Sequence, residues 1–217
     1  AVRTAEEENK ATVFGYWVDD PERYPTVAVF DFDGTLIRKD SFLEFIKFAF
    51  GKRAFLTGFF LNSPYLIAFK LKLYPNWKAK ERVFSYFFRG MSYEQFCRLG
   101  QDFAAALPAM QKSRQVDALR SHKLAGHRVY VVSASVEEWV APWCLNLGVD
   151  KVLATKVEVK EGRLTGRLLS KNCYGQEKVN RLLEVEPERN SYILHAYGDS
   201  RGDKEMLAFA DFPVWCK

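Results

Sequence analysis

The fold can be inferred first from the segment VAVFDFDGTL, residues Val27–Leu36. Its first four residues are apolar, and a short apolar run of this kind is typical of a strand buried on both faces. Asp31 and Asp33 follow the run, and Gly34 favours a turn. The segment therefore predicts a buried strand that delivers two carboxylates to its carboxyl end.

Similar apolar runs recur in the second half of the chain, with helical patterns between them. Val129–Val132 is followed by Ser133, and Tyr192–Tyr197 leads to Gly198 and Asp199. We also expect short strands at 152–154 and 213–215, a hairpin at 157–168 that turns at Glu161-Gly162, and helices at 134–147, 176–186 and 203–210. Strands that alternate with helices predict an α/β fold, with a doubly wound, mainly parallel sheet covered by helices on both faces.

The composition is that of a globular protein and not of a disordered or fibrous one. The 217 residues carry a net charge of +5, with 48% hydrophobic and 27% charged residues. This length suits one large domain, or a core domain with a small insertion. The four cysteines, at positions 97, 144, 173 and 216, have no metal-ligand spacing, so we expect reduced thiols and a cytoplasmic protein.

Basic and phenylalanine residues are concentrated in one part of the chain. Arg38–Arg98 contains 12 Lys or Arg against 4 Asp or Glu, and residues 41–96 hold 12 of the 18 Phe. Such a shift in composition predicts a separate structural unit. Its pattern is helical to about residue 125 and begins at a capping box, Ser41-x-x-Glu44. Breaks are expected near Gly51, Pro64, Pro75, Gly90 and Pro108.

We expect neither a membrane-spanning helix nor a signal peptide. The longest uncharged stretch, Ala54–Phe69, has 16 residues, whereas a spanning helix needs about 20. Acidic residues at positions 6–8 stand where a signal peptide would be basic and apolar. Residues 1–25 are polar and acidic, which predicts a tail or an edge segment.

The polar residues at the strand ends suggest chemistry, although each cluster alone is also typical of a simple turn. Ligands of open parallel sheets bind beyond the carboxyl ends of the strands, so these groups are expected at one crevice. Asp31 can serve as a nucleophile while Asp33 acts as general acid and base. Asp199 and Asp203 add hard oxygen ligands, which suit Mg²⁺. Donors for a phosphate are available from Ser133, Lys178 and the Gly34-Thr35 turn.

Four segments, in this order, resemble the motifs of the haloacid dehalogenase-like superfamily of phosphohydrolases. Asp31–Leu36 is similar to the first motif, Ser133 to the second, Lys178 to the third, and Gly198–Asp203 to the fourth. The phrase Val132–Ser135 (VSAS) and the hairpin resemble the phosphoserine phosphatase-like branch, subfamily IB. Family dehalogenases lack the acid at position 33, so the resemblance implies phosphoester hydrolysis, with mutase activity as a lesser alternative.

The resemblance implies a role for each matching residue. Asp31 would attack phosphorus and become an aspartyl-phosphate, and Asp33 would protonate the leaving oxygen and later activate water. Lys178 would hold Asp31 and the phosphate together. Phosphate oxygens would be bound by Gly34, Thr35, Ser133, Ala134 and Lys178. Mg²⁺ would be bound by Asp31, the main-chain oxygen of Asp33 and Asp199, while Asp203 would hold a metal-bound water or Lys178.

By the same resemblance, the basic and aromatic segment is a type-one cap. The expected boundaries are residues 39–113 for an all-helical cap, and residues 26–38 and 114–217 for the α/β catalytic core. The core of the cap is expected to contain Phe42, Phe45, Val83, Phe84, Phe87, Phe88, Phe96 and Phe103. The stretch Phe55–Leu73 is apolar on nearly all sides, which predicts either burial or contact with lipid.

Two substrate classes remain open. Trp77 and the Phe side chains would rest in a membrane interface, which would suit a lipid phosphomonoester such as phosphatidylglycerophosphate. The basic residues expected near anionic head groups are Lys47, Lys52, Arg53, Lys70, Lys72, Lys78 and Lys80. The cap looks similar to that of the bacterial C-type phosphatidylglycerophosphatases. The alternative is phosphoserine or another small soluble phosphomonoester. Asp40 stands where phosphoserine phosphatases carry a Glu that selects the substrate, or it simply begins a helix.

A third alternative belongs to another class of protein: a non-catalytic module that binds anionic membrane or nucleic acid on a decayed phosphatase core. No nucleic-acid motif is present, so we expect no nucleic-acid partner. The expected location is cytoplasmic, peripheral at the inner face of the membrane if the cap contacts lipid. The oligomeric state stays open. The histidines receive no role, because His122 and His127 suit a solvated surface and His195 suits a core strand.

Overall fold

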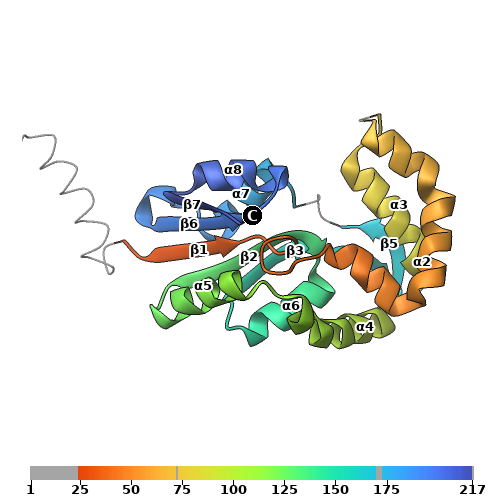
Figure 1. Ribbon diagram of the computed structural model, residues 1–217, viewed down its shortest axis with the longest axis horizontal. Helices are drawn as coiled ribbons and strands as arrows, with labels where there is room; N and C mark the ends of the chain where they lie inside the picture. Colours follow the sequence, from red (N-terminus) through yellow and green to blue (C-terminus); the bar gives the residue numbers. More distant parts are fainter. Residues whose placement is uncertain (1–23, 72, 170–172, 217) are drawn as a thin grey trace, which may run out of the picture.

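The structure is a computed structural model that describes residues 24–71, 73–169 and 173–216, without the side chains of Phe69 and Asn76. The tail predicted for residues 1–25 therefore falls almost wholly outside the described residues. Figure 1 shows a sheet covered by helices on one side of the molecule and a group of longer helices on the other.

Within the described residues, five parallel strands form the central sheet, in the spatial order β3-β2-β1-β6-β7. They are β1 (Thr26–Phe30), β2 (Arg128–Val136), β3 (Lys151–Thr155), β6 (Ile193–Gly198) and β7 (Phe212–Trp215). The chain winds outward in both directions from β1, because β2 pairs with one side of it and β6 with the other. The predicted doubly wound parallel sheet is confirmed, and its switch point lies between β1 and β6.

Helices cover both faces of the sheet, because side chains alternate along each strand. The covering helices are α5 (Ser113–Leu124), α6 (Glu137–Asn146), α7 (Gln176–Val185) and α8 (Lys204–Phe209). Ala28 and Phe30 of β1 pack toward α5 and α6, whereas Val27 and Val29 point toward α7 and α8. In Figure 1, α7 and α8 lie above the sheet and α5 and α6 lie below it.

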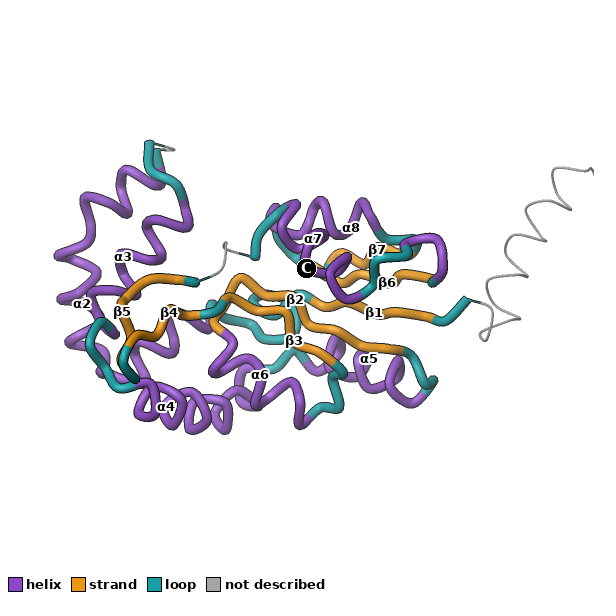
Figure 2. Tube along the Cα trace, turned by 180° about the vertical axis from the view of Figure 1, so that it is seen from behind, coloured by secondary structure: helices purple, strands orange, loops and turns teal. Residues whose placement is uncertain are grey.

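The residues between β1 and β2 form the separate group of helices. These are α2 (Ser41–Lys70), α3 (Asn76–Phe88) and α4 (Tyr93–Ala106), followed by a 3-10 turn at Leu107–Met110. The predicted hairpin is present as β4 (Val157–Lys160) and β5 (Arg163–Leu168). It packs on α3 so closely that a Cβ on Gly166 would lie 2.5 Å from Ser85 Oγ. Figure 2 shows this hairpin beside α2 and α3, beyond the end of the main sheet.

The segment that leaves the sheet for these helices runs beside the segment that returns. Arg38 N donates to Met110 O at 2.8 Å, and Lys112 N donates to Leu36 O at 2.8 Å. The residues between these pairs form an antiparallel bridge. The chain thus leaves and re-enters the core at one place, where the two connecting segments are paired.

Helix α2 differs from the prediction at its start and in its middle. Asp40 caps the helix, since its carboxylate accepts a hydrogen bond from Leu43 N at 3.1 Å, so the predicted capping box at Ser41 is wrong. The Ser41 side chain is turned into the core and has other partners. The helix kinks at Gly51, where φ is +79°, but it continues through Pro64, where the sequence predicts a break.

Phenylalanine fills the space between these helices, as the sequence predicts. The Phe45 ring packs against those of Phe88 and Phe96, with centroids 5.4 and 5.7 Å apart. It also stacks on Trp139 of α6 at 4.4 Å. This contact makes the aromatic cluster continuous with the core beneath the sheet. Of the eight predicted core residues, Phe87 is partly exposed and the others are buried.

The outer side of α2 and the residues after it are apolar and exposed. We define the outer ridge as Leu56, Phe60, Leu61, Ile67, Leu71, Leu73 and Trp77. Nowhere in the described chain does a helix combine the length and the apolarity that crossing a bilayer requires. The ridge residues of the stretch Phe55–Leu73 are exposed, so burial, one of the two predicted alternatives, does not hold for them, and contact with lipid stays a prediction.

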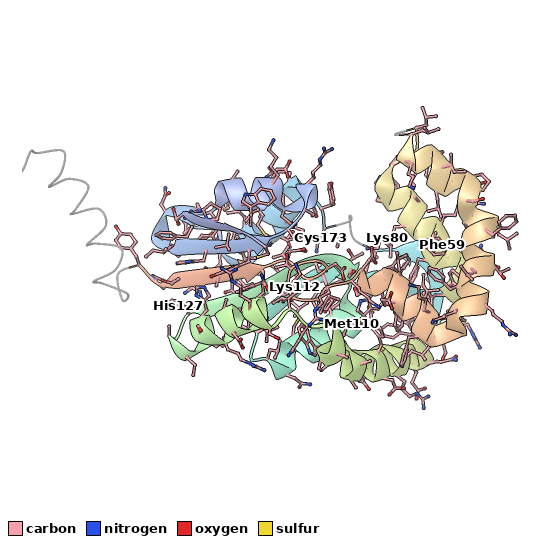
Figure 3. All side chains as sticks on the ribbon, in the orientation of Figure 1. Phe59, Lys80, Met110, Lys112, His127 and Cys173 are labelled. Carbon is pink, nitrogen blue, oxygen red and sulfur yellow. The ribbon has the colours of Figure 1, made fainter. Side chains whose placement is uncertain are left out.

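The histidines gather at the end of the molecule opposite Lys80, as the label on His127 shows in Figure 3. His122 is buried, with its Nδ1 2.7 Å from His127 Nδ1 and its Nε2 2.9 Å from the Tyr197 hydroxyl. The His195 ring packs edge-on against it, with centroids 5.0 Å apart. The predicted solvated position is therefore wrong for His122. Burial and the two neighbouring rings lower the pKa of His122 to about 4.

We expect this cluster to weaken the fold in acid. The pKa of His122 is about 4 in the folded chain against an ordinary value of 6.5. The unfolded chain therefore binds the proton first, and stability falls as the pH drops from 6.5 toward 4. His122→Asn should reduce the loss of unfolding free energy between pH 7 and pH 4.5 by about 1–2 kcal/mol. Urea unfolding of both proteins at each pH measures the difference, and parallel pH dependences would contradict the assignment.

Candidate active site

The carboxyl ends of β1, β2 and β6 meet at one edge of the sheet, where the winding direction of the chain changes. The four sequence segments singled out for their polar residues all reach this edge or the helix that starts beside it. Figure 3 shows Lys112 near these strand ends and Lys80 on the side of α3 that faces them.

Asp31 forms a buried ion pair at the centre of the site. Lys178 Nζ, from the first turn of α7, lies 2.5 Å from Asp31 Oδ1 and 2.5 Å from Asp203 Oδ1. Burial lowers the pKa of Lys178, but the two carboxylates outweigh this effect and raise it above its usual range. Burial raises the pKa of Asp31 to about 7, although Lys178 opposes the shift. The structure thus brings three of the predicted site residues into direct contact.

Both carboxylate oxygens of Asp203 already accept hydrogen bonds from the protein. Oδ1 accepts from Lys178. Oδ2 accepts from Asp199 N at 3.2 Å, from Ser200 N at 2.9 Å and from Ser200 Oγ at 2.8 Å. Asp203 therefore fixes the lysine and the turn after β6, and it stands behind Asp199.

The turn that follows Asp33 lies against Asp199. Thr35 Oγ1 is 3.4 Å from Asp31 Oδ2 and 3.4 Å from Asp199 Oδ1. Gly34 has a φ of +82°, and a Cβ at this position would lie 2.2 Å from Asp199 Oδ2. Glycine is therefore required both by the backbone conformation and by the adjacent carboxylate.

The acidic cluster suits a divalent cation. Asp31, Asp199 and Asp203 bring carboxylate oxygens within 4.8 Å of one another. The negative charge of Asp203 adds to burial in raising the pKa of both Asp31 and Asp199. Carboxylate oxygens are the ligands that Mg²⁺ prefers, and its charge would offset this repulsion. Asp31 and Asp199 are better placed to bind it than Asp203, whose oxygens are occupied.

Asp33 has a different set of partners. Its Oδ1 accepts a hydrogen bond from Ser41 N at 2.7 Å, and its Oδ2 accepts a short one from Ser135 Oγ. Burial, followed by the charge of Asp40, raises the pKa of Asp33, while the donors from Ser135 and Ser41 oppose the shift. A carboxyl group that is readily protonated suits a general acid.

Ser133 and Ala134 lie within β2 and not after it, because the strand continues to Val136. The apolar run ends at Val132, but the strand continues. Its later residues can be polar and buried because their polar groups have hydrogen-bond partners inside the protein. Ser133 Oγ accepts from Ser135 N at 3.0 Å, and Ala134 O accepts from Thr155 Oγ1 at 2.9 Å. Ser133 is buried, and Ala134 lines the same cavity as Asp31.

Lys80 belongs to the site but escapes the sequence analysis. This α3 residue donates a short hydrogen bond to Ala134 O. Burial lowers the pKa of Lys80, although the charges of Asp33 and Asp40 oppose this. The sequence groups Lys80 with Lys78 among the residues expected near anionic head groups, and this expectation is wrong for Lys80, which lies in the site.

Lys112 is a second residue of the site that the sequence does not predict. Its Nζ donates to Gly34 O at 2.5 Å and to Cys216 O at 3.3 Å. The lysine thereby ties the first loop to the last residues of the described chain. These segments are far apart in the sequence and meet only in the folded protein, so no local pattern predicts the contact.

A cavity of about 650 Å³ joins the carboxylates to α2 and α3. Asp31, Asp33 and Lys178 line its polar end, and Asp40 also borders it. The remaining wall is mainly apolar and contains Phe42, Leu43, Phe59, Leu66, Ile67, Ala79 and Val83. Because Ile67 is also part of the outer ridge, the apolar wall continues onto the exposed surface.

Curated proteins resemble the chain over most of its length. Protein CicA of Caulobacter vibrioides is 36% identical over 190 residues, which cover 86% of this chain and 84% of that protein. A probable phosphatase of Mycobacterium tuberculosis is 30% identical over 207 residues, which cover 85% of this chain and 66% of that protein.

Solved structures share the architecture. A Bordetella pertussis protein of unknown function matches with a TM-score of 0.73 at 22% identity, covering 85% of this chain and 86% of that chain. A substrate-bound phosphoserine phosphatase matches with a TM-score of 0.59 at 19% identity, covering 85% of this chain and 82% of that chain. At these identities the matches support the fold alone.

The family model of haloacid dehalogenase-like hydrolases matches residues 28–208. This range runs from β1 to α8 and includes Asp31, Ser133, Lys178 and Asp199, which carry the four segments described above. The chain belongs to the haloacid dehalogenase-like hydrolase family.

Proposed function

We propose that the chain is a Mg²⁺-dependent phosphomonoester hydrolase that works through an aspartyl-phosphate on Asp31. The observation that carries the proposal is the buried contact of Asp31 with Lys178, beside a cavity that a second carboxyl group, Asp33, also lines. The family match and the relative named as a probable phosphatase support the same class of reaction.

The two carboxyl groups divide the chemistry between them. In the first step, an Asp31 oxygen bonds to phosphorus while the ester P–O bond breaks, and Asp33 gives its proton to the departing oxygen. In the second step, Asp33 takes a proton from water. The water oxygen then bonds to phosphorus, and the aspartyl-phosphate bond breaks. The products are an alcohol and inorganic phosphate, and both carboxyl groups return to their starting states.

The remaining site residues bind charge. Mg²⁺, when bound, neutralises the phosphate and the carboxylates, and it would be held by Asp31, the main-chain oxygen of Asp33 and Asp199. Asp203 keeps Lys178 in place, and Lys178 holds the phosphate near Asp31. Phosphate oxygens would be bound by Gly34, Thr35, Ser133, Ala134 and Lys178.

We also propose that residues 39–113 act as a cap over a core of residues 26–38 and 114–217. Helices α2 and α3 supply most of the apolar wall of the cavity, and the strand ends supply its carboxylates. A substrate in the cavity would therefore lie between the two parts, which would keep bulk water from the reacting atoms while leaving room for the one water that the second step uses.

The substrate that best matches the cavity is a lipid phosphomonoester such as phosphatidylglycerophosphate. An acyl chain can follow the apolar wall past Ile67 to the outer ridge. Exposed cations that neighbour the ridge residues in the described sequence include Lys52, Arg53, Lys70 and Lys78, and Lys72 lies outside the described residues. Apolar side chains flanked by basic ones suit a peripheral contact with an anionic membrane. A similarity of the cap to that of the C-type phosphatidylglycerophosphatases is part of the same proposal.

Phosphoserine is the second candidate. A Mycobacterium tuberculosis relative, 28% identical over 86% of this chain, is named phosphoserine phosphatase. Asp40 borders the cavity and would meet the amino group of this substrate, while it also caps α2. A small polar substrate would leave most of the apolar wall without a partner, which favours the lipid.

Asp31→Asn should abolish phosphate release. The amide cannot attack phosphorus, so we expect kcat/KM to fall by on the order of 10³-fold or more, and EDTA to silence the unmodified protein. The assay is phosphate release from p-nitrophenyl phosphate with added Mg²⁺. Asp117→Asn is the matched control, because Asp117 is exposed on α5 and pairs with Arg120. An unmodified protein without activity would favour the non-catalytic binding module.

Ile67→Glu should separate the two substrate classes. A charge on the apolar wall should lower kcat/KM for phosphatidylglycerophosphate in anionic vesicles by about tenfold and leave phosphoserine hydrolysis unchanged. Leu124→Glu, which changes an exposed leucine on α5, is the control. If the unmodified protein prefers phosphoserine or a sugar phosphate, the lipid assignment fails.

A further inference from the structure

A chain of buried hydrogen bonds connects α6 to Asp33. Trp139 Nε1 lies 3.0 Å from Ser41 Oγ, and Ser41 Oγ lies 3.0 Å from Ser135 Oγ. Ser135 Oγ in turn makes a short hydrogen bond to Asp33 Oδ2. Trp139, Ser41 and Ser135 are each at most 1% exposed, so water does not substitute for any of these contacts.

The chemistry of the indole fixes the direction of the first hydrogen bond. An indole N–H donates and cannot accept, so Ser41 Oγ accepts from Trp139. When Asp33 is ionised it can only accept, so the Ser135 hydroxyl donates to Asp33, and the Ser41 hydroxyl donates to Ser135 or to Asp33 itself. Reversal of the last two bonds would leave Asp33 as the remaining acceptor for the Ser41 hydroxyl hydrogen, on a carboxyl group to which the Ser41 backbone N–H already donates.

The other oxygen of Asp33 is restricted in the same way. Its Oδ1 accepts from the backbone N–H of Ser41 at 2.7 Å, and a backbone N–H also cannot accept. Donors therefore occupy one position on each oxygen of Asp33. A proton on this carboxyl group has to occupy a remaining position, and Asp33 lines the cavity.

The indole that sets the direction is itself held firmly. Trp139 stacks on Phe45 with ring centroids 4.4 Å apart and lies 6.5 Å from the Phe42 ring. Both phenylalanines belong to α2, the helix that also supplies Ser41. The aromatic cluster and the hydrogen-bond chain thus stabilise one arrangement of α2 against α6.

We propose that Trp139, Ser41 and Ser135 are positioning residues that form a one-way hydrogen-bond chain and keep the proton of Asp33 directed into the cavity, toward the leaving oxygen. The inference rests on the proposed hydrolase function and deepens it. It assigns a task in proton transfer to a tryptophan and two serines that bind neither phosphate nor metal.

The leaving group of the substrate provides the test. An alkyl phosphate such as glycerol 3-phosphate needs a proton on its departing oxygen, whereas p-nitrophenolate departs without one. Ser135→Ala should therefore lower kcat/KM about 10- to 100-fold for the alkyl phosphate and less than about threefold for p-nitrophenyl phosphate. Ser41→Ala and Trp139→Phe break the same chain farther from Asp33 and should show the same selectivity with smaller losses.

The controls separate positioning from packing and from failure of the proposed function. Trp143→Phe makes the same aromatic change on the same helix and should leave the ratio of the two substrates unchanged. Thermal unfolding of every variant reports whether the fold is retained. If one of the three variants is unstable, the other two still test the hydrogen-bond chain. Equal losses for both substrates would overturn the chain while leaving the hydrolase function intact. If the unmodified protein released phosphate no faster than Asp31→Asn, both the hydrogen-bond chain and the proposed hydrolase function would be overturned.

Discussion

Asp31, Asp199 and Asp203 hold their carboxylate oxygens within 4.8 Å of one another, and the ammonium of Lys178 lies against two of them. Like charges this close are unfavourable in a buried site, so the surrounding backbone has to fix them. The parallel pairing of β1 with β6 brings the first and last acids together. The absence of a side chain at Gly34 leaves room for Asp199. The start of α7 is positioned to deliver the lysine.

The two carboxyl groups of the first loop show how environment divides labour between identical side chains. Asp31 lies in an acidic cluster with a lysine, which suits a nucleophile beside a cation. Asp33, two residues later, receives its hydrogen bonds from hydroxyl and backbone donors at the start of α2 and in β2. Environments that differ in this way separate acid, base and nucleophile roles. One tight loop can therefore carry both functions.

The sequence predicts the sheet and the convergence of the acids because both depend on local patterns. Apolar runs such as Val129–Val132 mark the strands, and a glycine turn after Asp33 marks a strand end. It does not predict the burial of His122, which depends on a ring from β6 packing against α5. It also misplaces the cap of α2, because Ser41 is drawn inward by Trp139, almost a hundred residues later. Contacts between residues that are distant in the sequence produce no local pattern of residues from which they could be predicted.

The paired connection between the sheet and the inserted helices has an evolutionary consequence. Since Arg38 and Met110 are hydrogen-bonded neighbours, the two ends of the insertion lie side by side whatever its length. Lengthening, shortening or exchange of the intervening helices therefore need not disturb the strands on either side. Such exchange has to preserve the first turn of α2, where Ser41 and Phe45 contact α6. It also has to preserve the contacts of α3 with β2 and with the hairpin, through Lys80 and Ser85, whereas the outer part of α2 can vary and with it the shape of the cavity.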